Sequence, residues 1–64
     1  MNIAEYIEQV RKNQGRSKTW VAEQININYK TFVDRAAHNR FTADDLIKIS
    51  KVLNINLEKM KEEI

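Results

Sequence analysis

The side chains that could do chemistry in this chain are hydrogen-bond donors and cations, and they do not form a catalytic set. Cysteine is absent and His38 is the single histidine, so neither a thiolate zinc site nor a histidine pair can be built. No paired-carboxylate, nucleophile–base or phosphate-cradling glycine pattern indicates an enzyme. We therefore expect no catalytic activity, no metal and no cofactor, which leaves binding as the chemistry that these residues offer.

A group of polar side chains follows Asn28, and apolar residues are mixed into it. At the start of a helix that enters the major groove, such side chains would face the edges of DNA bases. A lysine can donate to guanine O6 and N7, a threonine or valine can touch a thymine methyl group, and an aspartate can accept from cytosine N4. The candidate base-reading residues are Tyr29, Lys30, Thr31, Val33 and Asp34. For Asp34 a second interpretation stays open, which is a local pair with Lys30 or His38 at four-residue spacing.

Cations and capping side chains stand on both sides of this group and suit phosphate oxygens, which position a protein on DNA without being read as sequence. Ser17 and Lys18 lie at the start of an expected helix, and the free amides at that helix end favour an anion. The candidate phosphate-binding residues are Arg16, Ser17, Lys18, Asn28, His38, Asn39 and Arg40. Arg11 and Lys12 are either further phosphate contacts or solubilising charges, and the sequence favours neither interpretation.

The charge of the chain is unevenly distributed, although the net charge is only +2. Residues 1–10 carry −2, and residues 41–64 carry −1. Residues 11–40 carry seven Lys and Arg against two Asp and Glu, a net +5, and they contain all four arginines. A basic middle segment on a nearly neutral scaffold favours a polyanion bound along one face. The alternative is a solvated face without a partner.

The length bounds the fold to one domain, residues 1–64. No apolar run approaches the roughly 18 residues of a membrane span, and the first residues lack the layout of a secretory signal. The absence of cysteine suits a reducing compartment. We expect a cytoplasmic protein without membrane contact. We also expect no small-molecule ligand, since no ligand-sensing segment follows the helices.

Apolar residues recur at helical spacing along the whole chain, and no segment shows the sustained period of two that a strand requires. Proline is absent and Gly15 is the only glycine. Gly15 can end the first helix in the left-handed conformation, while Ser17 and Thr42 can cap later helices. We expect an all-α fold of five helices, near residues 3–14, 17–25, 28–38, 42–53 and 57–63.

Two turns share one design, and they lie in segments 25–28 and 53–56. In each, the first asparagine (Asn26 or Asn54) can take the left-handed conformation, and the second can cap the next helix. The isoleucine between them is expected to point inward. The first turn joins two short helices, an arrangement typical of a helix-turn-helix. Small Ala22 lies where the two crossing helices need a close approach.

These patterns resemble the phage repressor and Cro class of helix-turn-helix regulators, the XRE family. The likeness spans nearly the whole chain and is carried by Val21-Ala22, Ile25-Asn26-Ile27, Phe32, Leu46-Ile47-Lys48-Ile49 and Leu53-Asn54-Ile55-Asn56-Leu57. The resemblance implies a compact five-helix, lambda-repressor-like domain that regulates transcription by occupying an operator in double-stranded DNA. It also implies that the helix beginning at Asn28 enters the major groove, often in a homodimer.

Three positions depart from the family pattern. Asn26 stands where glycine is usual, and asparagine can adopt the same backbone conformation at some cost. Arg35 stands where a second apolar residue is usual, so that Ala36 can take over the packing and the helix can be slightly rotated. The family's usual ending of this helix is replaced by residues 36–39, Ala-Ala-His-Asn, and the phosphate contact usual at that corner is not carried over.

The remaining apolar residues are the candidates for contact with a second copy of the chain or with another protein. Trp20 stands at a position usually exposed in the family and is expected to pack as core, although it could stack on sugar-phosphate or on a partner. The expected homodimer face consists of Phe41, Leu57, Met60 and Ile64, unless these residues complete the core. A second hypothesis is a protein-interaction module, such as an antirepressor or antitoxin, which would use Trp20, Phe41 and the last helix to bind another regulator.

Overall fold

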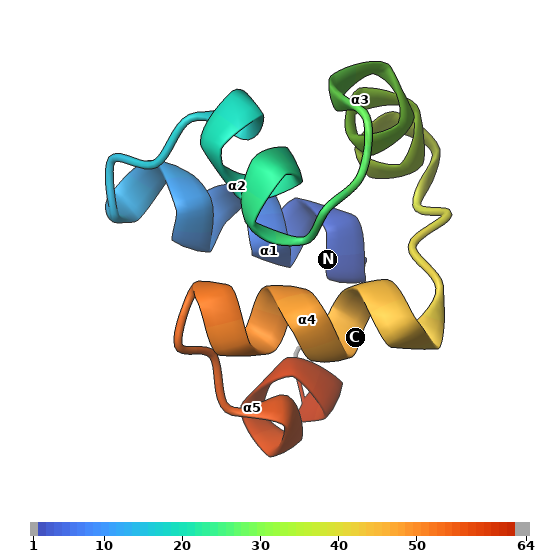
Figure 1. The fold of residues 1–64 in the computed structure, drawn as a ribbon. Helices are drawn as coiled ribbons and strands as arrows, with labels where there is room; N and C mark the ends of the chain where they lie inside the picture. The colour runs from blue at the N-terminus through green and yellow to red at the C-terminus, as the bar shows by residue number, and fades with distance from the viewer. Residues whose placement is uncertain (1, 63–64) are drawn as a thin grey trace.

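The computed structural model describes residues 2–62, which form five helices and contain no strand. The helices are α1 (Ile3–Asn13), α2 (Lys18–Gln24), α3 (Tyr29–His38), α4 (Ala43–Val52) and α5 (Leu57–Glu62). Figure 1 shows α2 and α3 above α1, with α4 and α5 below. The all-α, five-helix prediction is confirmed, and each described helix end lies within one residue of the predicted range.

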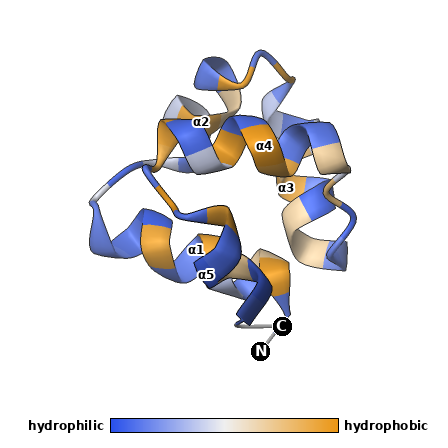
Figure 2. Ribbon diagram, turned by 90° about the horizontal axis from the view of Figure 1, so that it is seen from below, coloured by the Kyte–Doolittle hydropathy of each residue, from blue (hydrophilic) through white to orange (hydrophobic). Residues whose placement is uncertain are grey.

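One hydrophobic core holds the five helices together, and every helix contributes to it. The buried core residues are Ile7, Val21, Ala22, Ile25, Phe32, Ile49, Leu53 and Met60. Figure 2 shows hydrophobic segments in orange interrupted by hydrophilic ones in blue, as expected for helices that bury one face. Ala22 is 1% exposed. Its small side chain therefore lies where α2 packs closely inside the fold, as predicted.

The helices begin where capping side chains satisfy their first free amides. The Ser17 side chain accepts from the Trp20 amide at 3.0 Å, and Asn28 Oδ1 accepts from the Lys30 amide at 2.7 Å. Asn56 Oδ1 accepts from the Glu58 amide at 2.8 Å. Thr42 forms a reciprocal capping box at the start of α4. The predicted caps of α2, α3 and α4, and the cap at Asn56, are confirmed.

Within residues 2–62, four residues take the left-handed backbone conformation and turn the chain between helices. Gly15, Asn26 and Asn54 have φ values of 69°, 60° and 57°, so the predicted turn conformations are confirmed. Ile27 and Ile55 between the asparagine pairs pack against the core. The fourth residue is Asn39, which ends α3 with a φ of 53°. The left-handed conformation of Asn39 was not predicted.

The burial of the remaining apolar residues corrects the expected dimer face at Met60 and bears on the expectation that Trp20 packs as core. Met60 does not lie on an exposed dimer face, because it is 1% exposed and belongs to the core, where α5 packs on α1. Trp20 is half-buried and packs against the core. Phe41 is also half-buried, and its ring centroid lies 5.5 Å from that of Phe32. Leu57 is 40% exposed, and Ile64 lies outside the described residues.

None of the helices within residues 2–62 is long and apolar enough to cross a membrane, the longest having 11 residues. In the same part of the chain, no group of three or more His, Asp or Glu side chains is arranged to hold a metal ion.

Candidate nucleic-acid interface

Helix α3 is anchored by one fully buried side chain, has half-buried residues on its flanks and exposes its remaining surface. Phe32 is the buried residue of α3. At about 100° per residue, the direction away from Phe32 is occupied by Lys30, Asp34 and Ala37, all of which are exposed. We call these three residues, with Tyr29 at the helix start, the outward face of α3.

The sequence-predicted base-reading residues divide between this face and its edges. Tyr29, at 49% exposed, and Lys30 are both open to solvent at the start of α3. Thr31 and Val33 are half-buried, and the helical period places them on opposite flanks of the outward face. Asn28 precedes this group and holds the Lys30 amide, which leaves the Lys30 side chain free to extend.

Asp34 is paired with a histidine one turn further along α3. The His38 ring nitrogen Nδ1 lies 3.2 Å from Asp34 Oδ1 and 3.0 Å from the Asp34 carbonyl oxygen. Both side chains are more than half exposed. Of the two interpretations of Asp34, the structure shows the local pair with His38.

Three helices meet at an open hollow beside the outward face. The hollow has a volume of about 210 Å³ and is lined by Glu8, Lys12, Lys18, Val33, Ala36 and Ala37. It places one lysine from α1 and one from α2 next to the Val33 flank of α3. Lys12 therefore stands with Lys18 on the side of the molecule where α3 is open.

Two of the four arginines are used inside the fold. Arg11 is 8% exposed, its Nε lies 2.7 Å from Glu8 Oε2, and it donates to the Arg16 carbonyl oxygen at 2.7 Å. Glu8 Oε1 is buried without a hydrogen-bond partner among the described residues. Arg35 pairs with Asp45 at 2.6 Å. Both interpretations of Arg11, as a phosphate contact and as a solubilising charge, are therefore wrong, because its guanidinium is buried and closes the α1–α2 turn.

Several predicted phosphate-binding residues also have structural roles. Ser17 and Asn28 cap helices, as described above. Asn39 Oδ1 accepts from the Ala4 amide at 3.2 Å and so ties the end of α3 to the start of α1. The Arg40 amide donates to the Arg35 carbonyl oxygen at 2.8 Å, while its side chain is exposed. Arg16 is exposed, with its guanidinium carbon 4.3 Å from the centroid of the Trp20 ring.

The middle segment of the chain leaves several cations at the surface and few acidic residues. Within residues 11–40 they are Lys12, Arg16, Lys18, Lys30 and Arg40, and the acidic residues there are Glu23 and Asp34. On α4 and α5, by contrast, lysines alternate with carboxylates, and among the described residues two pairs form, Lys48–Asp44 at 3.0 Å and Lys61–Glu58 at 3.8 Å. The basic character predicted for the middle segment therefore concentrates around α2, α3 and the turns beside them.

The Arg35–Asp45 pair and the hollow beside Lys12 were not predicted. The sequence does contain part of the signal for the first, because Thr42 and Asp45 have the spacing of a capping box. The partner of Asp45 is ten residues away in another helix, and helical periodicity does not connect the two.

No family model, curated protein or solved structure matches this chain. What the chain binds is therefore inferred from the geometry and charge of the α2–α3 surface.

Proposed function

We propose that this protein is a sequence-specific regulator of transcription that binds double-stranded DNA, as the resemblance to phage repressors and Cro proteins implies. The observation that carries the proposal is the outward face of α3. This face starts with the exposed Tyr29 and Lys30 and is flanked by surface cations from α1, α2 and the turn after α3. In a helix-turn-helix, the first residues of the second helix contact base edges in the major groove.

The side chains divide into base-reading and phosphate-binding groups. Lys30 and Tyr29 provide donors for base edges, and Val33 and Ala37 provide methyl groups for contact with thymine. Lys18, Arg16 and Arg40 provide cations for the phosphates on either side of the groove. Sequence preference comes from the first group, and most of the salt-dependent affinity comes from the second.

The operator is expected to be two-fold symmetric and bound by two copies of the chain. Leu57 and Ile47 support this part of the proposal, since they are 40% and 44% exposed in one copy. Met60 takes no part in such a face because it is buried.

A selection from a library of random duplexes tests the proposal. The expected result is enrichment of one short sequence, with half-sites about 34 to 36 Å apart if two copies bind. Affinity for the enriched duplex should fall with rising salt, with a logarithmic slope of about −0.9 for each phosphate neutralised. Recovery of no preferred sequence, together with affinity that does not depend on salt, would refute DNA binding and favour the protein-interaction module.

A further inference from the structure

The Arg35–Asp45 ion pair joins the candidate DNA-reading helix to α4. We propose that Asp45 is a positioning residue, whose carboxylate fixes the rotation of α3 about its own axis. By fixing this rotation, Asp45 determines which side chains the outward face of α3 presents to DNA. This inference rests on the proposed function for its consequence, although the geometry of the pair is independent of DNA.

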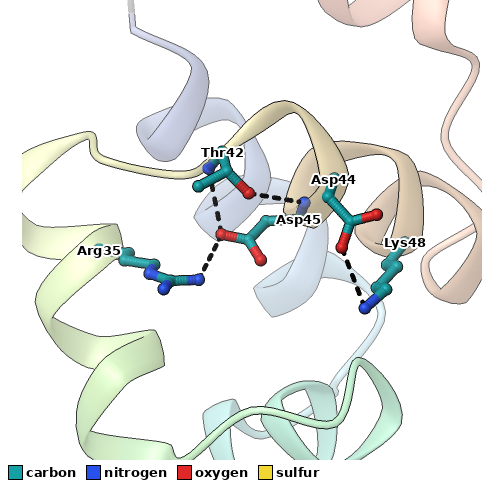
Figure 3. Close-up of polar contacts among 5 residues, drawn as sticks. All are labelled: Arg35, Thr42, Asp44, Asp45 and Lys48. Carbon is teal, nitrogen blue, oxygen red and sulfur yellow. Dashed lines mark hydrogen bonds and ion pairs between the residues drawn. The ribbon is translucent and has the colours of Figure 1, made fainter.

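The Asp45 carboxylate is itself held in place. Its side chain is 5% exposed. Oδ2 accepts from the Thr42 amide at 3.1 Å and from Arg35 Nη1 at 2.6 Å, and the Asp45 amide donates to Thr42 Oγ1 at 3.1 Å. Figure 3 shows these contacts converging at the start of α4. A carboxylate fixed by the helix cap is a rigid point of attachment for a side chain from a neighbouring helix.

Helix α3 needs such an attachment because its hydrophobic anchorage is narrow. Phe32 is its fully buried residue, while Val33 and Ala36 are half-buried, and so narrow an apolar contact restrains the rotation of a helix less than a full apolar stripe does. Arg35 stands where the family pattern has a second apolar residue. Its side chain is 31% exposed, and its link to Asp45 supplies the second restraint that an apolar residue would otherwise supply.

A small rotation of α3 is enough to matter for base reading. Side-chain ends lie about 5 to 6 Å from the axis of an α-helix, so a rotation of about 20° moves them by about 2 Å. Functional groups need to be held within about 0.5 Å of their productive geometry. Loss of the restraint is therefore expected to reduce discrimination between sequences more than it reduces attraction to phosphates.

The chain contains a matched control for this carboxylate. Asp44 lies beside Asp45 in the first turn of α4, but its side chain is 72% exposed and pairs with Lys48 on the same helix at 3.0 Å (Figure 3). Asp44→Asn and Asp45→Asn change the same charge near the same helix terminus. Only the second change removes the charge that faces Arg35.

The first arm of the test measures the orientation of α3 without DNA. Residual dipolar couplings of the backbone amides give the directions of α3 and α4 in the wild type and in the Asp45→Asn, Asp44→Asn and Arg35→Met variants. Asparagine keeps an oxygen for the Thr42 amide, and Arg35→Met leaves the cap intact, so one variant remains informative if the other fails to fold. We expect changed couplings in α3 for Asp45→Asn and for Arg35→Met, and wild-type couplings for Asp44→Asn. A variant that combines Asp45→Asn with Arg35→Met should show no larger change than either substitution alone.

The second arm measures affinity for a duplex recovered by selection and for a scrambled duplex of the same composition. Asp45→Asn and Arg35→Met should lower the ratio of the two affinities about tenfold, the size of one lost base contact. Binding to the scrambled duplex should be kept. A role in stability alone would weaken both duplexes equally and leave the ratio unchanged.

The two arms separate this inference from the proposed function. Unchanged α3 couplings in both Asp45→Asn and Arg35→Met would overturn the positioning role, and so would an unchanged affinity ratio in a wild type that selects a sequence. Failure of the wild type to prefer any duplex would refute the proposed function. In that case changed α3 couplings would still establish that the ion pair orients the helix.

Discussion

Lys30 combines a fixed backbone with a free side chain at the start of α3. Asn28 Oδ1 holds its amide at 2.7 Å, and the side chain is exposed on the outward face. A cation in this position can reach a guanine edge at a small cost in backbone ordering, because the helix cap has already fixed the main chain.

Replacement of Lys30 by alanine is expected to weaken binding to the selected duplex by about 1 to 3 kcal/mol and to relax the preference at one base pair. Titration of the variant against duplexes substituted at each position would measure both effects. Lys48→Ala is the control, because Lys48 is also exposed but lies on α4 and pairs with Asp44. Equal weakening on every sequence would instead identify Lys30 as a phosphate contact.

The sequence predicted those residues whose conformation depends on their own chemistry and near neighbours. Gly15, Asn26 and Asn54 take the left-handed conformation, because glycine and asparagine tolerate it and each follows the last turn of a helix. Asn39 was assigned to phosphate binding instead. Its structural role depends on the Ala4 amide, 35 residues away, and local pattern carries no information about that contact.

At the scale of the helices, α4 shows how one element contributes both to the core and to the surface. Ile49 is fully buried in the core, while Ile47, two residues away, is 44% exposed. The two isoleucines have the same helix propensity and nearly the same sequence context. They differ in burial, which makes them a matched pair for measuring the energy of the core.

Ile49→Val is expected to lower the free energy of unfolding by about 0.5 to 1.5 kcal/mol, because it leaves a methyl-sized void in a packed core. Ile47→Val should change that free energy by less than about 0.5 kcal/mol, as is typical of surface positions. Urea unfolding followed by circular dichroism would compare the two. Equal losses would show that α4 is packed differently from the structure, with Ile47 also inside.

Element boundaries were predictable because each helix begins at a capping residue and carries a periodic apolar stripe. The arrangement of the helices was less accessible. Met60 belongs to the stripe of a short terminal helix, and only the packing of α5 on α1 decides that this stripe is buried. Likewise, Arg35 read alone is a departure from an apolar pattern, and its role is evident only when α4 brings Asp45 next to it.

At the scale of the whole molecule, the fold separates two kinds of surface. Residues 2–62 form a body whose principal extents are 28 × 22 × 19 Å, with α3 on one side and α4 and α5 on another (Figure 1). Residues 11–40, which include α2 and α3, carry a net +5, while α4 and α5 carry both signs of charge, with pairs such as Lys61–Glu58 at 3.8 Å. A duplex would therefore be attracted to the α3 side.

Chemical-shift mapping with a selected duplex tests this central claim most directly. Nitrogen-15-labelled protein would be titrated with the duplex, and each backbone amide would be followed through the titration. The account predicts the largest changes at 16–18, 28–34 and Arg40, with smaller changes around Ile47 and Leu57, where two copies are proposed to meet. Changes concentrated on α4 and α5, with residues 28–34 unaffected, would contradict it.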